Sequence, residues 1–169
     1  VSSRSDFPSR VVNIGSVMHF KLENNTIPIL TTKKTAWKTC LKELLWFIKG
    51  DTSNKTLNEK NVHIWDGNSS REFLDSRGLN SYEEGDLGPI YGFQWRHFNA
   101  EYKSSKDIYY NKGIDQLQEV IDTLKDPEKR NSRRMIVSAW NPCQLNEMAL
   151  PPCHVMFQFH ITQGNKLSC

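Results

Sequence analysis

The sequence predicts an α+β domain in which helices pack beside a β-sheet. Apolar residues recur at helical spacing over residues 37–48 and 114–124, and residues after Cys153 alternate between apolar and less apolar side chains, as in a strand. A chain of 169 residues can bury a sizeable core but is too short for two domains of ordinary size. We therefore expect one domain over residues 1–169.

The first expected element is a strand over residues 10–22, where several β-favouring side chains fall close together: Val11, Val12, Met18 and Phe20. A helix should follow, with Thr31 or Thr32 as its N-cap and Gly50 just beyond its end. Its apolar side chains form one stripe made of Trp37, Cys40, Leu41, Leu44, Leu45 and Ile48. Glu43 lies beside this stripe, so we expect that carboxylate to be either paired or functional.

Residues 67–111 are expected to be rich in loops, with an aromatic cluster at Tyr91, Phe93, Trp95 and Phe98. A second helix is expected from about residue 114 to residue 125, where Asp126-Pro127 ends it. Two strands then follow, one at residues 135–140 and one that starts near Cys153.

The composition is typical of a globular protein, with 37% hydrophobic and 24% charged residues. The net charge of +3 is too small to imply nucleic-acid binding by itself. No signal peptide and no charge-free apolar run of membrane length is found. None of the four cysteines forms a C-x-x-C pair, so we expect no metal site, and free thiols in a reducing intracellular setting.

The strongest local candidate for chemistry is Cys153, which follows Pro151 and Pro152 and precedes His154. The prolines would fix its direction, and a nearby cation such as Arg133 or Arg134 would favour the reactive thiolate. From this tetrapeptide alone, a buried structural cysteine is the more common outcome.

Other candidates are weak when taken singly. Arg133 and Arg134 could clamp a phosphate but could equally be a solvated pair. Trp65 and Tyr91 could line a pocket for a flat ring, although aromatic residues more often belong to the core. Glu43 is more often a salt-bridge partner than a catalytic acid.

Together these residues lie in long runs that resemble the thymidylate synthase family, in the order and near the spacing of that family. The matching runs are PILTTK at 28–33, ELLWFIKG at 43–50, IWDGN at 64–68, DLGPIYGFQWRHF at 86–98, GIDQL at 113–117, SRR at 132–134, SAWNP at 138–142 and MALPPCH at 148–154. Residues 71–75 and the insert after them look eukaryotic or viral, and some members of the family are fused behind a dihydrofolate reductase.

The resemblance implies that Cys153 attacks C6 of the uracil of dUMP, which 5,10-methylene-tetrahydrofolate then methylates to dTMP, without a metal. It implies that Glu43 organises proton transfers through water and that Tyr91 acts at the chemical step. Trp65 and Asn68 match residues that line the folate site, and Lys33 would reach the folate tail.

The resemblance also implies a fold in which helices pack beside a mixed β-sheet that forms the interface of a homodimer. Arg133 and Arg134 match arginines that hold the nucleotide phosphate of the partner subunit, and Arg4 matches another phosphate ligand. The cytoplasm is the expected compartment, with the nucleus as the alternative, and neither a membrane nor a nucleic acid is required.

The chain departs from the family at its ends. Residues 4–10 read RSDFPSR, where the family has a loop with two glycines, and Asp6 adds a negative charge near the expected phosphate. The family extends further at both ends, so we expect the domain to be incomplete and inactive alone.

Three alternatives remain open. A pyrimidine hydroxymethylase of the same family, acting on dCMP or dUMP, would use the same cysteine, and its deciding residue would lie beyond Cys169. A non-catalytic dimerising fragment would explain the altered loop at Arg4. A Cys-His hydrolase is disfavoured, because adjacent residues such as Cys153 and His154 point to opposite faces of a strand.

Overall fold

The computed structural model describes residues 15, 17–162 and 165–169. The chain divides into two units, residues 1–35 and 36–169, which are described separately. Arg4 and most of the strand predicted over residues 10–22 lie outside the described residues.

The described part of the first unit is irregular apart from a short 3-10 helix, η2, over Glu23–Asn25. The predicted strand is wrong for residues 17–22, which form no β-strand. Val17, Met18 and Phe20 are instead exposed. The physical reason is that β-favouring side chains make a strand only where another strand supplies hydrogen bonds, and no described residue pairs with this segment.

Helix α1 spans Trp37–Ile48 and begins later than predicted. Its N-cap is Ala36, not Thr31 or Thr32, and no side chain caps it. Its end was predicted correctly, because Gly50 adopts φ +72° just past the last turn. The N–H of Gly50 donates to Phe47 O (2.9 Å) and that of Asp51 to Trp46 O (3.4 Å), the two bonds of a Schellman motif.

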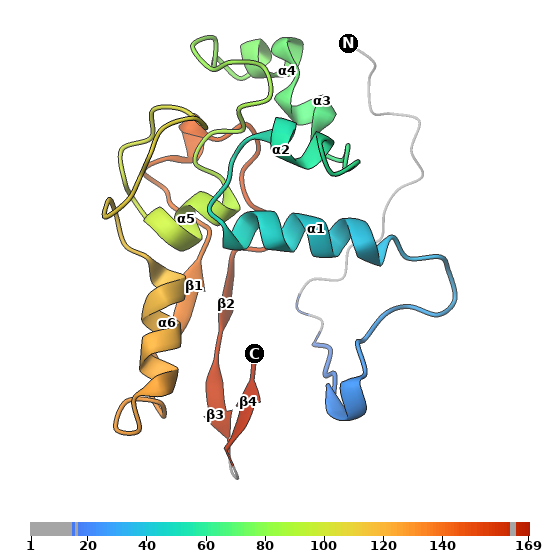
Figure 1. Cartoon of the computed structure of the whole chain (residues 1–169), viewed down its shortest axis with the longest axis vertical. Coiled ribbons are helices and arrows are strands. Elements are labelled where there is room, and N and C mark those ends of the chain that lie inside the picture. Colours follow the sequence, from blue (N-terminus) through green and yellow to red (C-terminus); the bar gives the residue numbers. More distant parts are fainter. Residues whose placement is uncertain (1–14, 16, 163–164) are drawn as a thin grey trace. The chain divides into compact units, whose positions relative to one another are not determined.

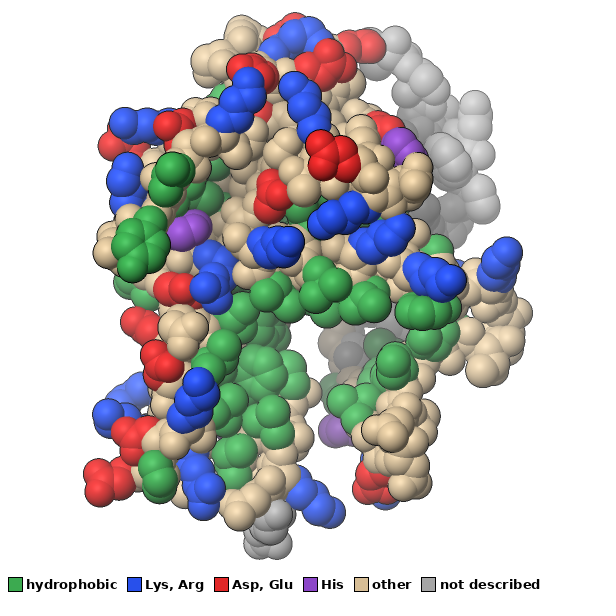
Figure 2. Space-filling view, viewed as in Figure 1, with side chains coloured by type: hydrophobic (Ala, Val, Ile, Leu, Met, Phe, Trp, Pro, Cys, Tyr) green, Lys and Arg blue, Asp and Glu red, His purple; other side chains and the backbone are tan. Residues whose placement is uncertain are grey.

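The buried face of α1 is not the predicted one. Trp46 and Phe47 are its buried residues. The predicted stripe is largely exposed, and Figure 2 shows hydrophobic side chains gathered along this helix: Trp37, Leu41, Leu44, Leu45 and Ile48. The two bulky aromatic side chains pack against neighbouring rings in residues 36–169, whereas Leu44 and Ile48 of the stripe line an open pocket of about 440 Å³ in that unit.

The stretch predicted to be mostly loop contains short helices. After α2 (Asn54–Asn58) come α3 (Asp66–Ser69), α4 (Arg71–Ser76) and α5 (Tyr91–His97). Helices of four to seven residues carry too few turns to show a helical repeat. A local signal was present for α4, since the Ser70 hydroxyl accepts the N–H of Phe73 as an N-cap (3.2 Å).

Helix α6 spans Gln116–Lys125, close to the predicted range. Its N-cap Asp115 accepts the N–H of Gln118 (2.9 Å), and its end at Asp126 agrees with the stop signal. Helix α5 packs against both α1 and α6, so it forms the centre of the helical layer (Figure 1).

The described strands form two antiparallel pairs. Strand β1 (Ile136–Ser138) pairs with β2 (Met156–Gln158), and β3 (His160–Thr162) pairs with β4 (Lys166–Ser168) (Figure 1). A 3-10 turn, η3, lies over Leu145–Glu147. The expected mixed sheet is therefore wrong for the described residues, although the α+β class is confirmed. Parallel pairing needs a crossover between strands, and β2, β3 and β4 follow one another too closely for one.

The core joins the helices to the β1–β2 pair. Its buried members include Trp46, Trp65, Tyr91, Trp95 and Val137. A buried polar group lies beside this core, where Gln94 Nε2 donates to Gln144 Oε1 (2.9 Å) and Asn141 Nδ2 donates to the same oxygen (3.0 Å). Buried amides are tolerated there because they satisfy one another.

Gly92, in the first turn of α5, touches the backbone of α1. A Cβ placed on Gly92 would lie 2.3 Å from Phe47 O and 2.7 Å from Phe47 Cα. Both neighbours are backbone atoms, which cannot rotate away as a flexible side chain could. The two helices can approach this closely only because residue 92 has no side chain.

We expect Gly92→Ala to reduce the free energy of unfolding by about 1–3 kcal/mol, the usual cost of forcing an extra carbon into a packed interior. The measurement is urea denaturation of the full-length protein. Gly67→Ala is the matched control, since Gly67 is also helical and a Cβ there would have no atom within 4 Å. Equal stability of the two variants would contradict the backbone contact.

Candidate functional site

A pocket of about 250 Å³ lies between α1, α3, α5 and the loop before β2. Its lining residues are Glu43, Ile64, Trp65, Asn68, Tyr91, Leu150 and Cys153. Five of these were predicted from the sequence as site residues, although they come from separate parts of the chain. The remaining two, Ile64 and Leu150, were missed, and their only signal was that they stand beside Trp65 and beside the Pro151-Pro152-Cys153 run.

Cys153 is an exposed free thiol at this pocket. The more common outcome of a buried structural cysteine is therefore wrong here. Pro152 before it is buried, and the backbone N–H of Cys153 donates to the hydroxyl oxygen of Tyr91 (2.6 Å). The thiol is thus presented by a backbone that is fixed at two consecutive residues.

Tyr91, the first residue of α5, connects the thiol to the core. Its side chain is only 4% exposed, and its ring lies 4.7 Å from that of Phe47 and 6.1 Å from that of Trp65. Burial raises the pKa of Tyr91, and the neighbouring Cys153 and Glu43 raise it further, while the N–H of Cys153 opposes the rise. The phenol therefore stays protonated at neutral pH.

Glu43 reaches the pocket from α1 and is half-buried. Burial raises the pKa of its carboxyl group, and a hydrogen bond from Trp65 Nε1 to Glu43 Oε1 (2.7 Å) partly lowers it again. A carboxyl group whose pKa is raised in this way keeps its proton to a higher pH than a solvated glutamate does.

His154 lies against the aromatic wall of the site. Its ring centroid is 4.3 Å from that of Tyr91 and 6.0 Å from that of Trp95. Partial burial lowers the pKa of His154, which favours its neutral form. His154 is not among the residues that line this pocket, and its exclusion as a general base stays a prediction.

Arg133 and Arg134 stand just before β1, at the end of the β1–β2 pair opposite to the end where the loop from Cys153 enters, and their effect on the thiolate stays a prediction. Gln158 donates to the carbonyl of Arg133, whereas the loop from Cys153 enters β2 at its other end. Cys153 lies in a bend before β2, whereas Gln158 is the last residue of that strand. Both arginines are exposed.

Two further predicted residues are not placed at the pocket. Lys33 belongs to the unit of residues 1–35, so its role toward folate stays a prediction. Arg4 lies outside the described residues. Among the described residues, no group of three or more histidine, cysteine or acidic side chains could hold a metal ion. None of the described helices has the length and hydropathy needed to cross a membrane.

The sequence profile described as "Thymidylate synthase" matches residues 3–169. The chain belongs to the thymidylate synthase family. This match covers both described units and every pocket residue, so the cysteine, the glutamate and the tyrosine of the pocket lie within the family domain.

Individual members of the thymidylate synthase family are closely similar. The chain is 53% identical over 156 residues to the bifunctional dihydrofolate reductase-thymidylate synthase of Leishmania major, covering 92% of this chain and 30% of that protein. It is 58% identical over 150 residues to a probable thymidylate synthase of Schizosaccharomyces pombe (88% and 24%). It is 56% identical over 150 residues to thymidylate synthase of Ascaris suum (89% and 50%). The chain thus spans about a quarter to a half of the length of these relatives.

We expect Trp65→Phe to raise the pKa of Glu43 further, because the indole N–H that stabilises the carboxylate is lost while the burial remains. The measurement is a ¹³C NMR titration of the Glu43 carboxyl group. Trp37→Phe is the control, since Trp37 lies on the same helix as Glu43, α1, but its side chain is exposed. An unchanged or lowered pKa in Trp65→Phe would contradict the assigned hydrogen bond.

Proposed function

We propose that this protein is a thymidylate synthase, which methylates dUMP to dTMP with 5,10-methylene-tetrahydrofolate as both carbon donor and reductant. The observation that carries the proposal is the meeting of Cys153, Tyr91, Glu43, Trp65 and Asn68 in one pocket. The match to the family is a similarity of sequence, whereas the pocket places the proposed nucleophile, Cys153, beside a carboxyl group that can transfer protons, Glu43.

In the proposed reaction the Cys153 thiolate adds to C6 of the uracil ring, and C5 gains the electron density of an enolate. C5 then attacks the one-carbon unit of the folate, and loss of the C5 proton releases tetrahydrofolate as a leaving group. Hydride from that folate reduces the exocyclic methylene to a methyl group, and expulsion of Cys153 gives dTMP and dihydrofolate.

The residues around Cys153 suit these steps. Tyr91 holds the backbone N–H of the nucleophile at 2.6 Å, which fixes the direction of attack. Glu43, with its raised pKa, would hand protons through water to and from the pyrimidine. Trp65 and Asn68 would contact the folate on the α3 side of the pocket, and Lys33 would reach its tail.

The dUMP phosphate would be held by arginines, including Arg133 and Arg134 of a partner subunit and Arg4. The support for sharing is that the pair is exposed and lies at the far end of the β1–β2 ribbon from Cys153 of its own chain. A homodimer would let each chain fill the phosphate site of the other. The proposed compartment is the cytoplasm, with the nucleus as the alternative.

A denaturing intact-mass spectrum tests the reaction. Full-length protein incubated with 5-fluoro-dUMP and methylene-tetrahydrofolate should gain the mass of both ligands, because fluorine at C5 blocks the proton loss and traps the adduct. Peptide mapping should place the added mass on Cys153.

Cys153→Ala should show no adduct, whereas Cys143→Ala, at another exposed free cysteine, should still form it. Absence of the adduct from the wild-type protein would contradict the synthase proposal and favour the cytosine-directed hydroxymethylase or a non-catalytic role.

Mixed dimers test the sharing of arginines. Arg134→Ala and Cys153→Ala proteins should each be inactive, and unfolding and refolding them together should restore about a quarter of wild-type activity per active site. Each heterodimer has one site with both changes and one with neither, and random pairing makes half of the dimers mixed. Mixing Arg134→Ala with itself is the control, and no recovery in the mixture would contradict a shared site.

A further inference from the structure

Helix α3 and its N-cap contribute residues to two pockets. Trp65, the N-cap, and Asn68 line the candidate site. Asp66 and Ser69 line a second pocket of about 380 Å³. The full lining of the second pocket is Asn54, Lys55, Asn58, Asp66, Ser69, Glu84 and Gly85. Residues three apart share one face of a helical turn, so this turn presents one face to each pocket.

Contacts with the surroundings must orient α3, because a single isolated turn of helix is not stable in water. On the side of the second pocket, Nδ2 of Asn54 donates to Asp66 Oδ1 (2.8 Å) and to Ser69 Oγ (3.0 Å). The first bond is the main cause that lowers the pKa of Asp66, so its acceptor is a carboxylate at neutral pH. The two acceptors belong to the first and the last residue of α3. One amide group therefore fixes both ends of the turn.

Asn54 is itself held in place by the residues around it. It is only 3% exposed, and its backbone N–H donates to Gly85 O (2.8 Å). The N–H of Gly85 in turn donates to Ser69 O (2.9 Å). The carbonyl of the preceding residue, Ser53, accepts the indole N–H of the buried Trp46 (3.2 Å). The position of α3 is thus linked through Asn54 to the core.

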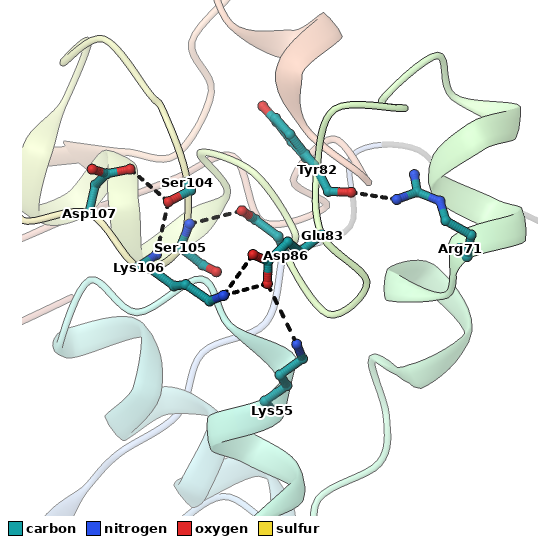
Figure 3. A network of polar contacts seen from close by, with 9 residues as sticks. All are labelled: Lys55, Arg71, Tyr82, Glu83, Asp86, Ser104, Ser105, Lys106 and Asp107. Carbon is teal, nitrogen blue, oxygen red and sulfur yellow. Dashed lines mark hydrogen bonds and ion pairs between the residues drawn. The ribbon is translucent and has the colours of Figure 1, made fainter.

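The neighbouring residue, Lys55, is held only by a surface ion pair. Its ammonium group lies 3.8 Å from the carboxylate of Glu83, which also binds Lys106 at 2.6 Å (Figure 3). These three side chains are 60–67% exposed, and exposed ion pairs stabilise a fold only slightly. Lys55 is therefore a suitable control for Asn54, since both residues lie on α2 and line the second pocket.

We propose that Asn54 is a positioning residue of the active site, which orients Trp65 and Asn68 toward the folate. The proposal rests on the function proposed above. Asn54 does not line the candidate site, so it would act through α3. The same turn sets the position of Trp65, whose indole N–H donates to Glu43 Oε1 at 2.7 Å. Loss of the two bonds from Asn54 would therefore displace the folate contacts and the bond to Glu43 together.

Steady-state kinetics of the full-length protein tests this role. Asn54→Leu nearly keeps the size of the side chain but has no N–H to donate. We expect it to raise the KM for methylene-tetrahydrofolate about tenfold, because displaced contacts weaken folate binding, while the KM for dUMP changes less than about twofold. Lys55→Gln should change neither KM by more than about twofold. A fall in kcat with both KM values unchanged would show a merely structural role and overturn the proposal.

A second measurement does not depend on activity and uses the ¹³C NMR titration of Glu43. Asn54→Leu should raise the pKa of Glu43, because the indole N–H of Trp65 no longer reaches the carboxylate, and Lys55→Gln should leave that pKa unchanged. An unchanged pKa in Asn54→Leu overturns the positioning role. Failure of the wild-type protein to form the adduct with 5-fluoro-dUMP would instead overturn the proposed function, and the titration would still decide whether Asn54 positions Trp65.

Ser69→Ala decides the question if Asn54→Leu does not fold. It removes one of the two acceptors of Asn54, and Ser69 does not line the candidate site. We expect the KM for methylene-tetrahydrofolate to rise about two- to fivefold, since one hydrogen bond is lost. Ser76→Ala, at an exposed hydroxyl group at the end of α4, is the matched control. An unchanged folate KM and an unchanged pKa of Glu43 in Ser69→Ala would overturn the proposal.

Discussion

The backbone contact between α1 and α5 determines where the site residues lie. The backbones of Phe47 and Gly92 touch without an intervening side chain. Glu43 lies one helical turn before Phe47 on α1, and Tyr91 is the residue before Gly92 on α5. Because backbone atoms cannot change rotamer, this contact fixes the two helices against one another. The carboxylate on α1 and the phenol on α5 consequently reach the same pocket.

The pocket is built on the core rather than on mobile loops. Trp65 and Tyr91 are members of the buried cluster and also line the pocket, so the packing that stabilises the fold also holds the site. The Cys153 backbone is attached to this framework through Tyr91, and Glu43 through Trp65. Each reactive group is thus positioned by an aromatic residue whose own position is set by burial.

The sequence alone could identify the site residues but not their surroundings. Cys153 was marked by its two prolines and Glu43 by its place beside an apolar stripe, and the family runs linked them to Tyr91, Trp65 and Asn68. The burial of Trp46 and Phe47 in place of that stripe could not be predicted, because helical spacing defines a face without stating what packs on it. Helices α2 to α5 are too short to show a helical repeat in the sequence. The hydrogen bonds of Asn54 could not be predicted either, because its partners Asp66 and Ser69 are twelve and fifteen residues away in the chain.

Helix α3 has a consequence for how this region can change in evolution. Within this turn Asp66 and Ser69 line one pocket and Asn68 lines the other, and Asn54 bonds to both Asp66 and Ser69. A substitution in α3 that changes the lining of one pocket therefore also changes the backbone that positions the lining of the other. Effects of paired substitutions within this turn should be strongly non-additive, as for any residues that share partners. The turn is therefore a point of epistasis, where a sequence drifting toward a new specificity on one side is constrained by what the other side tolerates.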